Sequence, residues 1–188
     1  MNALRAHADA IAQQLTADPA TIGHVMRANH TRIGVHTAHH EPVTIGGLGT
    51  FRYDNRHGVI FEVDIDLAQH VLHARAMPTP TGTISDEYAA LLSDDAQVTP
   101  DLVRAVLDAH TRLIARMLVE GAPVAYQGFG RYQPDKEVGV RFHPGSTLVS
   151  MIDNQGEAPR VAPPKRTHST ADMAHFIDKA AEENPDAH

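Results

Sequence analysis

Residues 124–148 read VAYQGFGRYQPDKEVGVRFHPGSTL, and residues 43–67 read VTIGGLGTFRYDNRHGVIFEVDIDL. Sliding the chain by 81 positions lays residues 42–71 on residues 123–152 without a gap. The matched pairs are Gly47 with Gly128, Gly49 with Gly130, Phe51 with Tyr132, Asp54 with Asp135, Gly58 with Gly139, Phe61 with Phe142 and Leu67 with Leu148. A shared register of glycines, aromatics and turn residues indicates an internal duplication.

The segments around this stretch repeat as well. A short helix is expected over residues 2–15 and again over residues 85–92. A longer helix follows in each copy and begins at a capping residue before a proline, Asp18-Pro19 or Thr99-Pro100. Three short strands come next, and a last helix spans residues 67–76 or residues 146–152. The predicted fold class is α+β, with helix, helix, three short strands and helix in each repeat of about 70 residues, plus a C-terminal extension.

The glycines between the first two strands of each copy are interpreted as structural. Glycine at these points suits a tight turn or bulge with positive φ, so the Gly-x-Gly pattern needs no phosphate-binding role. The predicted structural turn residues are Gly47, Gly49, Gly128, Gly130, Pro144 and Gly145. The sequence contains no nucleophile elbow, phosphate-binding loop or paired-carboxylate motif. We therefore expect no enzymatic activity, no catalytic residues and no cofactor.

Composition limits the classes of function. The 188 residues include 16 Lys and Arg against 23 Asp and Glu, a formal net charge of −7, and no cysteine. A phosphate-binding surface needs a local excess of positive charge, so this balance disfavours nucleic acid as the main partner. The lack of cysteine excludes disulfides and thiolate metal sites. No apolar run reaches the roughly 18 residues that span a bilayer, so we expect a cytoplasmic or virion protein without membrane contacts.

The sequence predicts four parts. The first repeat covers residues 1–77 and the second covers residues 85–152, with a proline-rich linker at residues 78–84 between them. Residues 153–188 form a C-terminal linker and a tail with a short helix. This tail is the predicted partner-binding segment, with candidate contacts at Arg160, Lys165, Arg166, Phe176 and Ile177.

Together these motifs resemble the HU/IHF family of small bacterial DNA-bending proteins. The second copy is the better match, because GFGRY at residues 128–132 and FHPGSTL at residues 142–148 are similar to the family's Gly-Phe-Gly-Thr-Phe turn and Phe-x-Pro-Gly-x-x-Leu corner. The first copy keeps GLGTF at residues 47–51 but has Asp64 where the family has the corner glycine. Two family subunits interlock into a dimer, so the resemblance implies an intrachain pseudodimer of the two repeats.

The sequence departs from the family in the element that bends DNA. Family members carry a long basic β-arm between the Gly-x-Gly strand and the Pro-Gly corner, and this arm wraps the minor groove. Here nine residues separate Phe51 from Phe61 and nine separate Tyr132 from Phe142, so neither copy has room for an arm. The remaining candidates for nucleic-acid contact on the strand region are Arg52, Arg56, Arg131, Lys136 and Arg141.

The histidines suggest a metal hypothesis. The chain has 14 His, and His36 and His40 have the i,i+4 spacing that presents two imidazoles to zinc on a helix. The alternative is exposed or capping histidines near a helix C-terminus, where a cationic ring is favourable. No HExxH motif is present, and we expect no bound metal.

Two functional hypotheses follow. The HU/IHF fold recurs without arms in ring or neck proteins of tailed bacteriophage virions. The resemblance therefore implies a non-enzymatic structural or adaptor protein that assembles into a homo-oligomer or larger complex through protein partners. The alternative is a nucleoid-associated protein of the HU/IHF type that binds DNA with its strand face, which would weaken steeply with salt.

Overall fold

The computed structural model describes residues 3–75 and 83–154. Its elements are α1 (Ala3–Leu15), α2 (Pro19–Ala38), β1 (Val43–Ile45), β2 (Gly49–Asp54), β3 (Gly58–Val63), α3 (Ile65–Leu72), α4 (Asp86–Ala96), α5 (Pro100–Val119), β4 (Val124–Tyr126), β5 (Gly130–Asp135), β6 (Gly139–Pro144) and α6 (Ser146–Asp153). Over these residues the chain is a mixed α+β fold with six helices and two antiparallel three-stranded sheets, which confirms the predicted class. None of the described helices is both long and apolar enough to cross a membrane.

The two long helices begin as the sequence predicts. Asp18 Oδ2 accepts the backbone N–H of Thr21 at 2.9 Å, and Thr99 Oγ1 accepts that of Leu102 at 3.3 Å. A proline follows each cap, at the first helical position, where no N–H is needed. From α2 to α3, each element begins 81 positions before its counterpart between α5 and α6.

Two of the predicted helices have wrong boundaries. The helix expected over residues 85–92 is α4, which runs a turn further to Ala96 and ends where Gln97 takes a left-handed conformation. The helix expected over residues 67–76 is α3, which ends at Leu72 rather than at residue 76 and also begins earlier, at Ile65. It does so because Asp64 caps it and accepts the N–H of Asp66 at 2.9 Å.

The end of the predicted linker also needs correction. Thr83 is only 2% exposed, and its hydroxyl donates to Asp108 Oδ1 at 2.6 Å. Its carbonyl oxygen accepts the N–H of Gly46 at 2.7 Å. The chain at Thr83 is therefore anchored between α5 and the turn after β1, and it does not act as a spacer there.

Each sheet is a simple antiparallel meander, with the strand orders β1-β2-β3 and β4-β5-β6. Phe51 pairs with Phe61 across β2 and β3, and Tyr132 pairs with Phe142 across β5 and β6. Directly opposite residues share one face of a sheet, so each pair of rings lies on the same side. That side is the inner one, since Phe51 and Tyr132 are buried.

Aromatic rings from the two sheets form one cluster. Ring centroids lie 5.2 Å apart for Phe51 and Phe142, and 5.5 Å apart for Phe61 and Tyr132. Phe129 adds a third contact between the halves, with its centroid 5.7 Å from that of Phe51. The two sheets therefore share a single hydrophobic core rather than covering separate ones.

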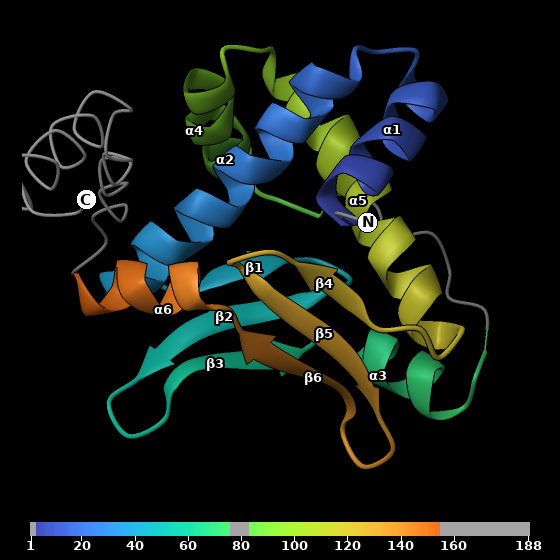
Figure 1. Ribbon diagram of the computed structural model, residues 1–188, viewed down its shortest axis with the longest axis vertical. Coiled ribbons are helices and arrows are strands. Elements are labelled where there is room, and N and C mark those ends of the chain that lie inside the picture. The colour runs from blue at the N-terminus through green and yellow to red at the C-terminus, as the bar shows by residue number, and fades with distance from the viewer. Residues whose placement is uncertain (1–2, 76–82, 155–188) are drawn as a thin grey trace, which may run out of the picture.

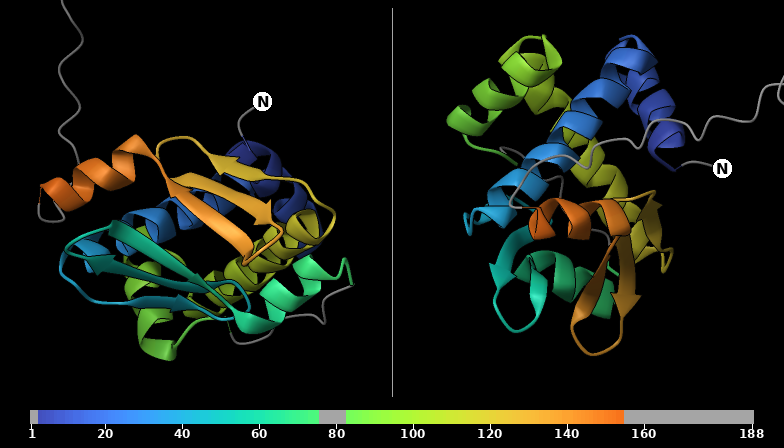
Figure 2. Two further views of the ribbon diagram at one scale, coloured as in Figure 1. Left: turned by 90° about the horizontal axis from the view of Figure 1, so that it is seen from below. Right: turned by 60° about the vertical axis from the view of Figure 1, so that its left-hand side comes forward.

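Helices α1, α2, α4 and α5 lie on one side of the two sheets, and α6 and α3 lie at opposite ends of them (Figures 1 and 2). The β2–β3 and β5–β6 hairpins project away from the four helices, also at opposite ends. Helices α1 and α4 each pack against both long helices, α2 and α5. Polar contacts tie α2 to α4: Arg32 binds Asp95 through two nitrogens at 2.5 and 2.7 Å, and the Tyr88 hydroxyl donates to Asn29 at 3.0 Å. Elements from the two halves of the chain are thus interleaved.

The Gly-Phe-Gly turn and the Pro-Gly corner are in contact with each other. A Cβ atom on Gly130 would lie 2.3 Å from Phe142 Cζ, and one on Gly145 would lie 2.4 Å from the carbonyl oxygen of Gly128. The Gly145 N–H donates to the carbonyl oxygen of Phe129 at 2.7 Å. The remaining predicted turn residues are Gly47, with φ of 73°, Gly49, whose surroundings match those of Gly130, and Pro144, the last residue of β6.

Candidate functional site

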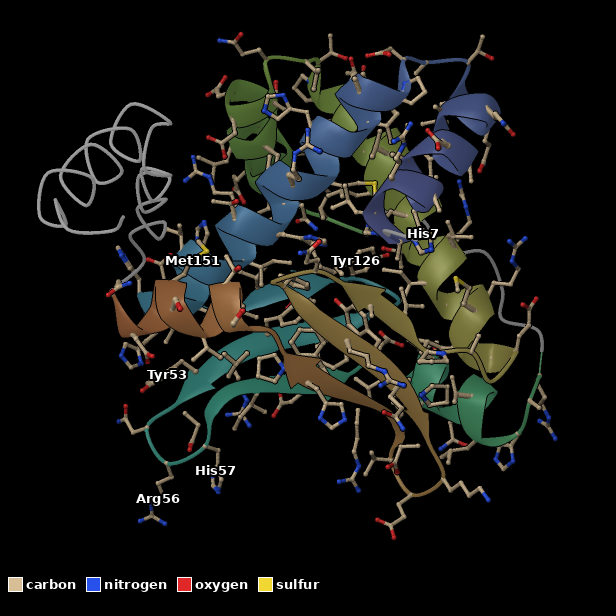
Figure 3. The ribbon with its side chains drawn as sticks, in the orientation of Figure 1. His7, Tyr53, Arg56, His57, Tyr126 and Met151 are labelled. Atoms are coloured by element: carbon tan, nitrogen blue, oxygen red, sulfur yellow. The ribbon has the colours of Figure 1, made fainter. Side chains whose placement is uncertain are left out.

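The β2–β3 hairpin ends in a turn that a carboxylate holds. Asp54 Oδ1 accepts the backbone N–H groups of Arg56 and His57, each at 2.9 Å, and lies 2.8 Å from His57 Nδ1. These hydrogen bonds, first that from Arg56, favour the carboxylate and hold the pKa of Asp54 below its ordinary value. The side chains of Arg56 and His57 consequently project from a fixed tip (Figure 3).

The β5–β6 hairpin is built in the same way. Asp135 Oδ1 accepts the N–H groups of Glu137 and Val138 at 2.8 and 3.0 Å, and these two bonds lower the pKa of Asp135. Arg141 donates through Nε to Asp135 Oδ2 at 2.5 Å and through a terminal nitrogen to Glu137 at 3.3 Å. The two aspartates that the internal alignment matches therefore fix both turns.

The basic side chains predicted as nucleic-acid contacts lie on these hairpins, but two of the five are ion-paired. Arg52 pairs with Glu62 across β2 and β3, and Arg141 pairs with Asp135 and Glu137. The three that form no ion pair with any described residue are Arg56, Arg131 and Lys136. Because carboxylates stand beside the arginines, the hairpins form a nearly charge-balanced surface rather than a basic one.

The hairpins differ in what covers them. A Cβ atom on Gly139, at the β5–β6 turn, would lie 2.6 Å from the Cα of Ala68 in α3. A Cβ atom on Gly58, its counterpart at the β2–β3 turn, would have no atom within 4 Å. Helix α3 therefore rests on the β5–β6 hairpin. Helix α6 packs on α2 instead, and a Cβ atom on Gly34 of α2 would lie 2.8 Å from Met151 Cε of α6.

We expect Gly139→Ala to destabilise the protein more than Gly58→Ala. The two glycines have similar positive φ, 82° and 73°, so a side chain adds about 1 kcal/mol of backbone strain at each. Only at Gly139 does the methyl group also collide with backbone, which should add about 2 kcal/mol. Urea denaturation of both variants measures the difference. Equal losses would contradict the contact between α3 and this hairpin.

The structure does not give His36 and His40 the helical spacing that the metal hypothesis requires. The helix stops at Ala38, and His40 has a positive φ of 60°, so His36 and His40 do not share a helical face. His36 Nδ1 lies 2.6 Å from Glu41 Oε2, while the His40 ring stacks edge-on against Tyr53 at 4.8 Å. Among residues 3–75 and 83–154, no three potential ligands lie together as a metal site would require.

A buried polar network between α1, α5 and β4 was not predicted. The Tyr126 hydroxyl lies 2.8 Å from His7 Nδ1 and 2.6 Å from His110 Nε2, and all three residues are buried (Figure 3). A hydroxyl has one proton, so it donates to one imidazole and accepts an N–H from the other. Burial disfavours charge and lowers the pKa of both histidines, and it raises the pKa of Tyr126. The network is therefore neutral.

His30 lies next to this network. Its ring stacks on Phe129 with centroids 4.0 Å apart and planes 7° apart, and its centroid is 4.9 Å from that of Tyr126. Burial lowers the pKa of His30 to about 3. The half-buried imidazole thus serves as a neutral ring at the edge of the core, close to His110, whose ring centroid is 6.1 Å away.

A pocket of about 300 Å³ opens beside His30. Its walls come from α1, α2, the β4–β5 turn and α6, and its lining residues are Leu4, Arg27, His30, Thr31, Gln127, Phe129, Thr147, Leu148 and Met151. The lining contains one fixed positive charge, that of Arg27, and no acidic side chain.

The tail residues predicted to bind a partner, Arg160, Lys165, Arg166, Phe176 and Ile177, lie outside the described residues.

Comparison of the sequence with family models and with curated proteins, and of the structure with solved structures, gives no match.

Proposed function

We propose that this chain is a non-enzymatic structural or adaptor protein with an armless, tandem HU/IHF-like fold, which assembles through protein–protein contacts. Its proposed setting is a ring or neck of a tailed phage virion. The observation that supports this most is the charge balance of the hairpins, where Arg52 and Arg141 are held by carboxylates of the same hairpin. A surface of this kind suits a protein partner better than a polyanion.

The interleaving of the two halves supports the pseudodimer part of this proposal. Helix α2 packs against α4 and α6 from the second half, and α1 packs against α5. The hydrogen bond between His7 and Tyr126 and the ion pair between Arg32 and Asp95 also join the halves. Two interlocked subunits of an HU/IHF-like dimer would exchange elements in this way.

The short hairpins support the armless part. Strands β2 and β3 are each six residues long and pair up to Asp54 opposite Gly58. Strands β5 and β6 pair in the same way up to Asp135 opposite Gly139. Each ladder ends at a three-residue turn, so neither hairpin has the reach to wrap a DNA groove.

The proposal is tested by titrating a labelled DNA duplex of about 30 base pairs with the full chain, from low to physiological salt, using fluorescence anisotropy. We expect no saturable binding even at low salt. Saturable binding that weakens steeply with added salt would instead support the alternative, a nucleoid-associated protein. Arg56, Arg131 and Lys136, which have no ion-pair partner among the described residues, would then be the first contacts to mutate.

If ion pairing keeps the hairpins from binding DNA, releasing the arginines should create binding. We expect Glu62→Gln combined with Glu137→Gln to bind the duplex saturably at low salt, where the wild type does not, because it frees Arg52 and loosens Arg141. The same anisotropy titration measures this gain. The matched control is Asp9→Asn combined with Glu87→Gln, which makes the same charge change at exposed helical positions. An equal gain in this control would show that net charge alone matters.

A further inference from the structure

The pocket between α1, α2 and α6 has a counterpart in the other half of the molecule, and there the chain itself fills the place. Thr83 is buried, its hydroxyl donates to Asp108 Oδ1, and its carbonyl oxygen accepts the N–H of Gly46. The 81-residue repeat matches Asp108 with Arg27 and Gly46 with Gln127, and both of these line the pocket. This place in the fold can therefore bind an extended stretch of chain.

The pocket differs from its counterpart in charge. Arg27, which is exposed and forms no ion pair with any described residue, stands where Asp108 accepts the hydroxyl and the N–H of Thr83. Of the three helices in the walls, α2 contains no acidic residue, α1 contains only Asp9 and α6 only Asp153, and neither aspartate lines the pocket. The group that complements this pocket is therefore a carboxylate.

The rest of the lining suits apolar side chains. Leu4, Phe129, Leu148 and Met151 supply apolar walls. The volume of about 300 Å³ is at the lower end of the range for ligand pockets, so the pocket suits side chains of a peptide better than a large ligand. A segment that fills it should combine a large apolar side chain with a neighbouring carboxylate.

The tail of this chain contains such a segment. Residues 172–178 read DMAHFID, and the sequence predicts a short helix in the tail. At helical spacing the apolar stripe of this segment consists of Met173, Phe176 and Ile177. Asp172 precedes Phe176 by four positions, which places the two on one face of a helix. Residues 171–186 carry five acidic side chains and a single lysine, so the segment complements a pocket whose fixed charge is positive.

The tail also starts beside the pocket. Helix α6 ends at Asp153, two residues after Met151 in the pocket wall. Residues 155–171 join this end to Asp172, and a chain of that length spans roughly 20–25 Å as a coil and about 50 Å when extended. The tether gives the segment an effective concentration of about millimolar at the pocket, which favours it over a segment of another protein.

We propose that residues 172–178 of the tail dock in this pocket of the same chain, with Phe176 between the apolar walls and Asp172 bound to Arg27. This inference does not depend on the proposed function. Docking covers the apolar stripe of the tail, so a partner that binds the tail has to compete with the pocket for it. The contact is thus autoinhibitory.

The test uses Phe176→Trp in the full chain, which contains no tryptophan of its own. The emission of the single indole should be shifted to the blue relative to the urea-unfolded protein, and the shift should stay constant over roughly a hundredfold range of concentration. Adding Arg27→Glu, at an exposed position, should return the emission to the unfolded value. Adding Asp172→Arg as well re-forms the ion pair with its charges exchanged and should restore the blue shift.

The matched control is Arg56→Glu, the same charge reversal at the tip of the β2–β3 hairpin, which Figure 3 places away from Met151. It should leave the blue shift unchanged. The wild type provides a second readout, because a docked segment is protected from proteases. Trypsin should cleave after Lys179 at least about tenfold more slowly in the wild type than in Arg27→Glu.

Equal cleavage of the wild type and of Arg27→Glu would overturn the inference. A blue shift that Arg27→Glu leaves unchanged would also overturn it, since the tail would then dock elsewhere. A blue shift that grows with protein concentration would do the same, since the tail would then dock on a second copy. The duplex titration described above reports on the proposed function alone, so the failure of one does not imply the failure of the other.

Discussion

Acidification from about pH 7 to about pH 5 should lower the free energy of unfolding by at least about 2 kcal/mol. Burial lowers the pKa of His30 to about 3 and that of His110 well below its ordinary value, so both stay neutral in the folded protein. In the unfolded chain each takes up a proton below its ordinary pKa of about 6.5. Their contribution is therefore complete above that pH and decreases as the pH falls. The loss from His30 alone is about 2 kcal/mol by pH 5, and His110 adds to it in the same direction.

Urea denaturation at several pH values between about 5 and about 7.5 measures this loss. Burial lowers the pKa of three histidines, His7, His30 and His110. His30→Gln removes one of these groups and should reduce the pH dependence of the unfolding free energy by about one proton. Gln14→Ala, an exposed change of a side chain that does not titrate, should leave the pH dependence as in the wild type. The carboxylates with lowered pKa, such as Asp54 and Asp135, titrate well below this range and do not contribute to it. A flat profile down to about pH 5 would contradict the buried neutral histidines.

Replacing Phe51 by alanine should lower the free energy of unfolding by about 4 kcal/mol. The side chain is 0% exposed and contacts rings from both halves, including Phe142 and Phe129. Its removal leaves a cavity at the centre of the shared core. Because that core belongs to both sheets, the variant should still unfold in one cooperative transition.

Thermal unfolding followed by circular dichroism and by tyrosine fluorescence gives the size and the cooperativity of the change together. Ile60→Ala, a change to a half-buried side chain on the neighbouring strand, is the control and should cost about 1 kcal/mol. Two separate transitions in the Phe51→Ala variant would mean that each half keeps its own core. That result would contradict the interleaved arrangement.

Local signals in the sequence predicted the helices and turns well. Asp18 and Thr99 mark helix starts because a cap and a following proline act within one turn. The Gly-x-Gly turns were also predictable from local sequence. The close surroundings of Gly130 leave no room for a side chain, so only glycine fits there. The start of α3 was missed because Asp64 was treated as a departure from Pro-Gly, although it is itself a good cap.

Two features could not be predicted from local patterns: the buried polar network, and the different packing around the β2–β3 and β5–β6 hairpins. His7 and Tyr126 are far apart in the sequence, and only the packing of α1 on α5 and β4 brings them together. One signal was present: His110 falls between Leu107 and Ile114 at helical spacing on the apolar face of α5. The two hairpins differ because α3 packs on the β5–β6 hairpin, whereas α6 packs on α2. The matched sequences of the two halves do not reveal this difference.

The interleaving of the halves has a consequence for synthesis on the ribosome. Helix α1 leaves the exit tunnel long before α5, on which it packs, and α2 leaves before α4 and α6. At the usual rates of translation, several seconds pass between these events. During that time apolar side chains such as Ile33 and Met26, which end fully buried, have no surface to cover them. The nascent first half therefore has to be shielded, and the native core assembles only once the second half has been made.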